Sequence, residues 1–163
     1  MNVCPPQRPN QVTASAAFSD GNGFVDVDQY TLQSKKYENV FGVGDSNNSP
    51  NPKTAASIFA STPTVIHNIN CVLQGVKTLP SFDGYGSCPI FVGDDKLLLA
   101  EFTFGGVPNE SFSKYPGIDQ SKPYKMFYYL KKDFFPYVYW NIAPKGNWYG
   151  KTHIRKPDLK AVV

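Results

Sequence analysis

The prediction of the fold starts from one short stretch, Asn39-Val40-Phe41-Gly42-Val43-Gly44-Asp45-Ser46. Its valine and phenylalanine residues favour a β-strand, and so short an apolar run is typical of a strand buried on both faces of a parallel sheet. In open α/β sheets, ligands bind beyond the carboxyl ends of the strands. We therefore expect a ligand beside Gly44 and Asp45, where the backbone is approachable and a carboxylate can accept hydroxyl or amide protons.

A helix is predicted to follow this strand. Apolar residues recur every three to four positions from residue 53 to about residue 74, and Gly75 is a suitable stop signal. Asn51 is the expected N-cap, with Pro52 in the first helical position. The free N–H groups of the first turn, the helix dipole and Lys53 would then all face an electron-rich ligand.

Three residues inside this helix have further implications. Pro63 is expected to kink or split the helix, because proline removes a backbone donor and clashes with the preceding turn. His67 and Cys71 lie four residues apart on one face, which is a spacing found for metal ligands, but no second pair of ligands converges on them. The sequence therefore predicts no metal site.

Asp45 has a second interpretation. Aspartate is common at the ends of strands, where it caps a turn without binding a ligand. The stretch also lacks the dinucleotide-binding fingerprint, because Asn47 stands where a third glycine would be needed. The residues by themselves leave both roles of Asp45 open.

The composition is that of one globular domain, with 163 residues, 41% of them apolar and 18% charged. Three cysteines without a CxxC pair argue against a disulfide framework and against a zinc site. The first residues carry neither a basic flank nor an apolar core, so no signal or transit peptide is predicted.

Beyond the helix, residues 88–92 and 97–104 are predicted to form two antiparallel strands around a turn. Residues near the beginning of the chain are rich in proline, glutamine, asparagine and serine, which indicates a loop. The chain is thus expected to have four parts: a loop (1–22), a strand with its glycine turn and helix (23–80), a hairpin with its loop (81–121) and a tail (122–163).

The tail is both basic and aromatic. Residues 122–163 hold nine of the 16 Lys and Arg residues and two of the 13 acidic ones, which gives +7 there and −4 in residues 1–121. Residues 124–149 hold 11 of the 24 aromatic residues. The longest uncharged run of the tail, 134–144, has 11 residues, whereas a membrane-spanning helix needs about 20. Pro136 is expected to break the tail into two short helices.

Aromatic side chains interleaved with lysine and arginine are typical of helices that lie on an anionic membrane surface. Two alternatives stay open for the tail, namely an aromatic core packed against the hairpin and a stacking platform for single-stranded nucleic acid. The membrane surface is the preferred interpretation, and no nucleic-acid partner is predicted.

The order of several motifs resembles that of the sulfide:quinone oxidoreductases of the mitochondrial type. These are flavoproteins with two dinucleotide-binding domains, and the stretch 39–45 resembles the last strand of their FAD domain. The narrower resemblance is carried by Asn2-Val3-Cys4-Pro5-Pro6, Thr31-Leu32-Gln33, Lys53-Thr54-Ala55-Ala56, Asp83-Gly84-Tyr85-Gly86-Ser87-Cys88-Pro89, Leu99-Ala100-Glu101-Phe102, Asp119-Gln120-Ser121-Lys122 and Tyr139-Trp140-Asn141.

This resemblance implies an α/β fold, the C-terminal portion of a FAD/NAD(P)-binding Rossmann-type fold with a small β-hairpin and C-terminal amphipathic helices. Residues 1–22 would then be a loop from a preceding NAD-like domain that is missing here. Residues 23–80 would end the FAD-binding domain, residues 81–121 would form the hairpin and its loop, and residues 122–163 would be the membrane-facing tail.

The resemblance also implies roles for individual residues. Asp45, beside Gly44, would bind the ribityl chain of FAD, and the backbone of Lys53 and Thr54 would stabilise negative charge on the reduced flavin. The tail would supply the membrane-facing helices at the quinone entrance. The expected quinone or membrane contacts are Phe59, Phe127, Phe134, Phe135, Tyr139 and Trp140.

Two departures from the family pattern limit what this chain would do alone. Ser46 stands where the family has a catalytic cysteine that accepts sulfide as a persulfide, and a hydroxyl cannot form a persulfide or a disulfide. The FAD fingerprint and the second catalytic cysteine of the family have no counterpart in these 163 residues. The chain is therefore expected to be a fragment that is inactive by itself.

The protein implied by the resemblance oxidises hydrogen sulfide, reduces ubiquinone and passes sulfane sulfur to an acceptor thiol. It would sit peripherally on the mitochondrial inner membrane. Because of Ser46, a non-catalytic paralogue and a quinone reductase with another electron donor are alternatives. A further alternative is a peripheral membrane-binding module without flavin, built from the hairpin and the tail.

Overall fold

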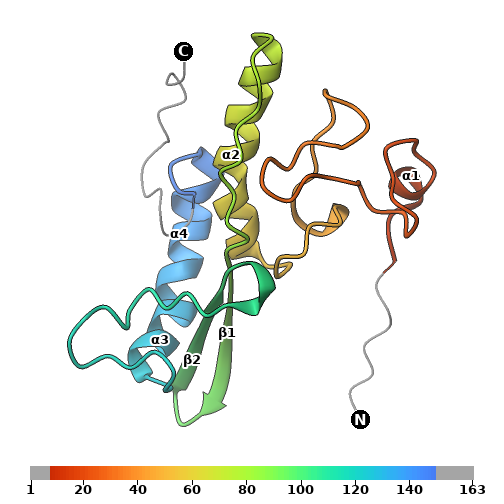
Figure 1. Ribbon diagram of the computed structural model, residues 1–163. Helices are drawn as coiled ribbons and strands as arrows, with labels where there is room; N and C mark the ends of the chain where they lie inside the picture. The colour runs from red at the N-terminus through yellow and green to blue at the C-terminus, as the bar shows by residue number, and fades with distance from the viewer. Residues whose placement is uncertain (1–7, 150–163) are drawn as a thin grey trace.

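The computed structural model describes residues 8–149, so the motif at residues 2–6 and the basic residues after 149 lie outside this range. The long helix α2 stands in the middle, with irregular loops on one side, a helical rod on the other and a hairpin at its lower end (Figure 1). The elements, including 3-10 turns η1, η2 and η4 and a π turn η3, are α1 (Gln11–Ala14), η1 (Gly44–Ser46), α2 (Ala55–Leu73), β1 (Gly86–Gly93), β2 (Lys96–Phe102), η2 (Phe104–Gly106), α3 (Lys125–Tyr129), η3 (Leu130–Phe134), α4 (Phe135–Asn141) and η4 (Ala143–Lys145).

The predicted parallel strand is not formed in residues 8–149, where the antiparallel pair of β1 and β2 is the only sheet. Of residues 40–43, Phe41 alone makes a bridge, and its partner is Gln33 in an antiparallel sense. A strand of a parallel sheet needs parallel neighbours, whereas the bridge that this stretch makes within the described residues is antiparallel. The mixed helix and strand content is compatible with part of an α/β domain, while the expected Rossmann-type sheet is not confirmed.

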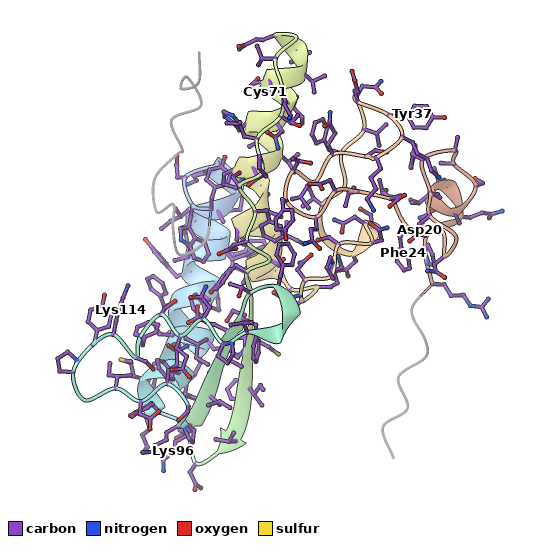
Figure 2. All side chains as sticks on the ribbon, viewed as in Figure 1. Asp20, Phe24, Tyr37, Cys71, Lys96 and Lys114 are labelled. Atoms are coloured by element: carbon purple, nitrogen blue, oxygen red, sulfur yellow. The ribbon has the colours of Figure 1, made fainter. Side chains whose placement is uncertain are left out.

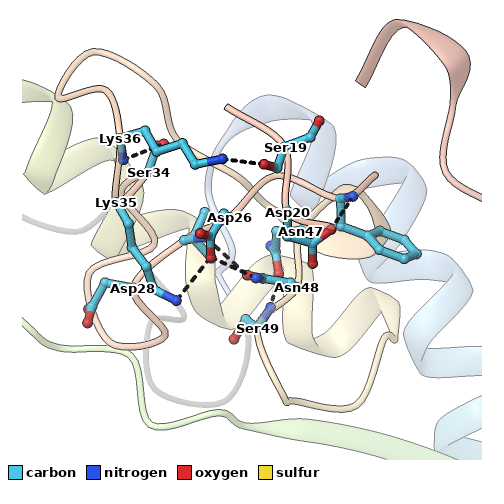
Figure 3. Close-up of polar contacts among 12 residues, drawn as sticks. Ser19, Asp20, Asp26, Asp28, Ser34, Lys35, Lys36, Asn47, Asn48 and Ser49 are labelled. Carbon is cyan, nitrogen blue, oxygen red and sulfur yellow. Dashed lines mark hydrogen bonds and ion pairs between the residues drawn. The ribbon is translucent and has the colours of Figure 1, made fainter. Parts of the chain in front are cut away.

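The loops between α1 and α2 have a small core of their own. The alternation predicted at residues 24–28 is present, with apolar side chains inside and carboxylates outside. The buried residues of this core are Val25, Val27, Leu32, Val65 and Phe82. On the outside, Asp26 accepts hydrogen bonds from Asn48 Nδ2 at 2.8 Å and from Lys35 Nζ at 3.0 Å (Figure 3). These polar contacts hold together loops that no sheet connects, and they keep the pKa of Asp26 below its ordinary value.

Helix α2 begins later than predicted. Its N-cap is Thr54, whose Oγ1 accepts a hydrogen bond from Ser57 N at 3.3 Å. The predicted N-cap, Asn51, instead donates from its side-chain amide to Pro52 O at 3.0 Å. The other end agrees with the prediction, because the helix stops just before Gly75, which has a left-handed φ of 68°.

Pro63 does not split α2, which was one of the two effects predicted for it. The helix runs without interruption from Ala55 to Leu73. Pro63 and the next two residues, Thr64 and Val65, are all buried. Packing against the loop core therefore offsets the cost of the donor that proline lacks, which is how most helices in proteins gain their stability.

A buried amide fixes α2 to the segments beside it. Asn68 is fully buried, and its Nδ2 donates to Thr31 O at 2.9 Å and to Leu79 O at 3.0 Å. Its Oδ1 accepts from Leu79 N at 2.8 Å. One side chain thus joins the helix both to the loops before it and to the segment that returns along it.

The predicted hairpin is confirmed. Strands β1 and β2 pair in an antiparallel sense around the turn Asp94-Asp95, whose φ angles of 50° and 53° are the left-handed values that tight hairpin turns require. Leu97 and Leu99 of β2 are buried and form a core with Phe127 of α3. The hairpin is therefore covered by the start of the tail.

Elements α3, η3 and α4 form one continuous helical rod over residues 125–141, hereafter the rod. The break expected at Pro136 does not occur. The reason is the π turn, in which Phe135 N donates to Leu130 O five residues earlier instead of four. The helix is wider one turn before the proline, which leaves room for its ring and accommodates the missing donor.

A buried carboxylate fastens the hairpin to the loop that follows it. Glu101 is 4% exposed and accepts hydrogen bonds from Tyr85 Oη at 2.5 Å, from Gln120 Nε2 at 2.7 Å and from both N and Oγ of Ser111 at 2.9 Å. Burial by itself raises the pKa of Glu101, but these hydrogen bonds outweigh burial and leave the pKa below its ordinary value. Neutral donors therefore hold this charge in place.

Replacing Glu101 by glutamine should destabilise the protein by about 1–3 kcal/mol at neutral pH, because an amide has one acceptor oxygen for all these donors. The folded-state pKa is lowered, so the carboxylate stabilises the fold above the ordinary value of 4.5 and stops doing so as pH falls through the lowered value. The difference between the two proteins should therefore shrink in acid, as measured by urea unfolding. Glu110→Gln, at an exposed position of the same loop, is the control, and equal stability of E101Q and wild type at neutral pH would contradict this role.

Candidate functional site

The predicted ligand site lies where the loops meet the start of α2. Gly44, the first residue of η1, has a φ of 66°, and a Cβ there would lie 3.1 Å from Ile58 Cδ1 of α2. Glycine is thus needed both for this conformation and for close packing of the helix. Asp45 follows at the surface, and its carboxylate makes no hydrogen bond within residues 8–149. It does not act as a turn cap here and faces solvent.

Ser46 closes the same turn. Its Oγ donates to Val43 O at 2.9 Å, and the residue is exposed. The side chain at the position of the family cysteine is therefore used for a local backbone contact. It has no acidic proton or soft sulfur with which to take up sulfide.

Lys53 does not present a free charge to a ligand, as the sequence suggested it would. Its Nζ donates to Ser49 O at 2.8 Å, to Asn47 Oδ1 at 2.9 Å and to Asn51 Oδ1 at 3.4 Å. Burial lowers the pKa of Lys53, and the Asp45 carboxylate opposes that effect. The side chain thus clamps the loop before α2 and keeps a positive charge close to Asp45.

The amino end of α2 keeps free donors. Thr54 N donates to Pro52 O at 3.1 Å, so this amide is already paired. The N–H groups of Ala55 and Ala56, in the first helical turn, have no partner within residues 8–149. With the dipole of a 19-residue helix behind them, these two groups favour an anionic or electron-rich partner.

Ser49 adds a buried polar group without a partner. The residue is 3% exposed, and its Oγ has no hydrogen-bond partner in the described part of the chain. An unpaired buried hydroxyl costs about 1–3 kcal/mol. The carbonyl of the same residue accepts from Lys53 Nζ, so Ser49 lies in the loop that Lys53 holds in front of α2.

The predicted quinone contacts fall into different environments. Phe59 of α2 and Phe135 of α4 both pack against Trp148, with ring centroids 5.4 Å and 6.4 Å from it. Phe127 has no exposed surface and belongs to the core beneath the hairpin, so a quinone cannot reach its ring. The exposed members are Phe134, Tyr139 and Trp140. Trp148, which joins α2 to the rod, was missed because nothing in its sequence neighbourhood distinguishes it from other tail aromatics.

The rod carries a shallow apolar groove that the sequence predictions missed. Its volume is about 560 Å³, and its lining residues are Met126, Tyr129, Leu130, Asp133, Phe134 and Tyr137. They recur every three or four positions, which places them on one face of a helix. That periodicity could have been found in the sequence had Pro136 not suggested a break.

Positive charge accompanies this groove on the rod. The side chains of Lys125 and Lys132 are exposed. Among the described helices, none is long and apolar enough to cross a bilayer. An apolar strip with lysines beside it suits contact with a surface whose interior is apolar and whose outside is anionic.

No protein-family model matches the chain. Three mitochondrial sulfide:quinone oxidoreductases are similar to it over nearly its whole length. The protein from Schizosaccharomyces pombe is 43% identical over 161 residues, which cover 98% of this chain and 35% of the relative. Those from Mus musculus and Dictyostelium discoideum are 38% and 40% identical, and each match covers 96% of this chain and 34% of the relative.

A solved structure is similar as well. It is a chain in the cryo-EM structure of the Tetrahymena thermophila mitochondrial ATP synthase, an F1Fo composite tetramer model, with a TM-score of 0.75 and 26% identity over 90% of this chain and 34% of that chain. The present chain thus spans about a third of the length of the proteins that it matches. The resemblance inferred from the motifs is confirmed: nearly the whole of this chain is similar to about a third of each of these mitochondrial sulfide:quinone oxidoreductases.

Proposed function

We propose that this chain forms the flavin-facing and quinone-facing part of a flavoprotein that oxidises sulfide and reduces ubiquinone. The observation that carries the proposal is the identity of 38–43% with mitochondrial sulfide:quinone oxidoreductases over nearly the whole chain. Because the match covers about a third of each relative, the rest of such an active site would come from residues outside these 163.

The residues around η1 and the start of α2 fit a flavin. Asp45 has a free carboxylate for a ribityl hydroxyl, and Gly44 beside it lets this turn pack closely on Ile58 of α2. The unpaired N–H groups of Ala55 and Ala56 would stabilise negative charge on the ring system, and the orphaned hydroxyl of Ser49 would gain a partner. FAD, when bound, supplies the two-electron chemistry between sulfide and quinone.

Within this site Lys53 and Thr54 would act by position. Lys53 holds the loop before α2 with three hydrogen bonds, and its charge lies near the proposed ribityl contact. Thr54 caps the helix, so that the next two amides are left free for the flavin. The flavin would thus be met at this helix end by backbone N–H groups and by no side chain of the first turn.

The rod would supply the quinone entrance and the membrane contact. Its apolar groove and its exposed aromatics, Phe134, Tyr139 and Trp140, offer surface for a quinone ring or for lipid. Phe59 and Phe135, which both pack against Trp148, would contact the quinone between α2 and the rod.

The matched relatives are mitochondrial, so we propose that the protein binds peripherally to the mitochondrial inner membrane. A small thiol would accept the sulfane sulfur.

A second candidate is a related protein without sulfur chemistry, and Ser46 favours it. The Ser46 hydroxyl donates to Val43 O at 2.9 Å and cannot take the place of a persulfide-forming thiol. The similar chain in the Tetrahymena thermophila ATP synthase structure adds an assembly role to this candidate. A non-catalytic paralogue or a quinone reductase with another donor would keep the fold and the membrane contact.

The flavin proposal can be tested in a chimera of the Schizosaccharomyces pombe relative in which this chain replaces the matching 161 residues. The purified chimera should be yellow and hold one FAD. Asp45→Ala should weaken FAD binding by about 10-fold to 100-fold, the loss of one charge-assisted hydrogen bond, measured by flavin fluorescence. Asp20→Ala, at a loop carboxylate that binds only its own backbone neighbours, is the matched control. A colourless chimera would sink the proposal.

The same chimera separates the two candidates. Ser46→Cys should raise sulfide-dependent quinone reduction by orders of magnitude if sulfur chemistry is the ancestral task of this site. A cysteine there could form a disulfide with the second cysteine of the relative, and sulfide would open it to a persulfide and a thiolate. After the outer sulfur passes to an acceptor thiol, FAD, when bound, would take up the two electrons released as the disulfide forms again. Ser46→Ala, which removes the hydroxyl without adding sulfur, should leave the rate unchanged. If S46C binds FAD and still reduces no quinone with sulfide, the second candidate is favoured.

Membrane contact through the rod predicts salt-sensitive binding of the full chain to vesicles that contain phosphatidylserine. Lys125→Gln and Lys132→Gln should each weaken binding, because a lysine near an anionic surface contributes about 1 kcal/mol. Lys77→Gln, at an exposed position after α2, should have no effect in the same sedimentation assay. Binding that ignores salt and lipid charge would argue against a membrane role.

A further inference from the structure

The proposed flavin and quinone sites leave one pair of reactive side chains unused. His67 and Cys71 lie one turn apart on α2, and the distance from Cys71 Sγ to His67 Nε2 is 3.4 Å. Cys71 is 5% exposed and His67 is half-buried, so the pair opens toward solvent on the imidazole side. Figure 2 shows Cys71 in the upper half of α2, away from the hairpin.

We propose that His67 and Cys71 bind a thiophilic divalent metal ion, with Zn²⁺ as the reference ion. Zinc lies about 2.3 Å from a thiolate sulfur and about 2.0–2.1 Å from an imidazole nitrogen, so a tetrahedral angle would put the two atoms about 3.6 Å apart. The observed 3.4 Å between Sγ and Nε2 is close to that separation. The two ligand atoms are therefore already spaced for chelation, and the ion would replace the proton now shared between them.

The backbone keeps this pair in place. Both residues lie inside the 19-residue helix. Between them, Asn68 fastens the helix to Thr31, and Val76 N donates to Cys71 O at 2.9 Å. Rigid elements position ligands more closely than loops do. The pair therefore needs little rearrangement to receive an ion.

Two protein ligands make this an open site. Within residues 8–149 no group of three His, Cys, Asp or Glu side chains could hold a metal, so water or a small anion would complete the coordination. Closed structural zinc sites have four protein ligands, and open ones exchange their remaining ligands. Binding releases the thiol proton to solvent, and the ion would be held reversibly.

The site is separate from the proposed flavin site. Cys71 follows Ala55 by 16 residues, which in a helix is about 24 Å. Metal binding at this pair therefore makes no use of the flavin residues. A failure of either proposal leaves the other standing.

The test uses the full chain carrying Cys4→Ser and Cys88→Ser, which leaves Cys71 as its one thiol. Titration with Cd²⁺, a spectroscopic substitute for Zn²⁺, should give an ultraviolet sulfur-to-metal charge-transfer band that saturates at one ion per chain and is displaced by Zn²⁺. His67→Gln in this background should weaken binding by about 10-fold or more, because one of two protein ligands is lost. Cys71→Ser in the same background, which leaves no thiol, should abolish the band.

A second readout does not depend on the band. Zn²⁺ should raise the melting temperature of the single-thiol protein, as any ligand that binds only the folded state does, and a chelator should reverse the shift. Circular dichroism shows whether the His67→Gln protein is folded, and its half-buried position makes that substitution mild. The proposal is overturned if the single-thiol protein shows no saturable band, or if H67Q binds Cd²⁺ as tightly as its parent.

Discussion

The packing of α2 on both sides is the constraint on which the rest of the structure depends. On one side Val65 joins the loop core, and the amide of Asn68 makes three hydrogen bonds to Thr31 and Leu79. On the other side Phe59 meets Trp148, which also stacks on Phe135 of the rod. The loops have no sheet of their own and the hairpin has two strands, so α2 is the element that joins the loop core to the rod.

The sequence predicted the elements whose signals are local. Gly75 ends α2 where it was expected, because a left-handed φ suits glycine and disfavours other residues. The hairpin formed as expected, because its turn and its alternating strand both lie within residues 86–102. Each of these signals depends on neighbours in the chain and on nothing distant.

The failures arose where distant contacts decide. The stretch around Val40 has the composition of a buried parallel strand, but such a strand needs parallel neighbours, and within residues 8–149 the bridge partner of Phe41 is antiparallel. Pro63 was predicted to kink or split α2, and Pro136 to break the tail into two helices. Burial of Pro63 offsets the cost of its missing donor, and a π turn accommodates Pro136. At the candidate site, Gly44 and Asp45 lie beside α2 as expected, whereas the internal use of Lys53 and the unpaired hydroxyl of Ser49 could not be read from residue types.

Two lysines of the tail, Lys131 and Lys122, are held by contacts within the protein. Lys131 Nζ donates to Pro89 O at 2.8 Å and lies 4.5 Å from the centre of the Phe91 ring, so this lysine ties the rod to β1. Lys122 is likewise paired with Asp119 at 2.9 Å. Lys131 keeps its charge, whereas the carboxylate of Asp119 offsets that of Lys122, so the density of mobile counterions around Lys122 should be lower than a count of basic residues implies.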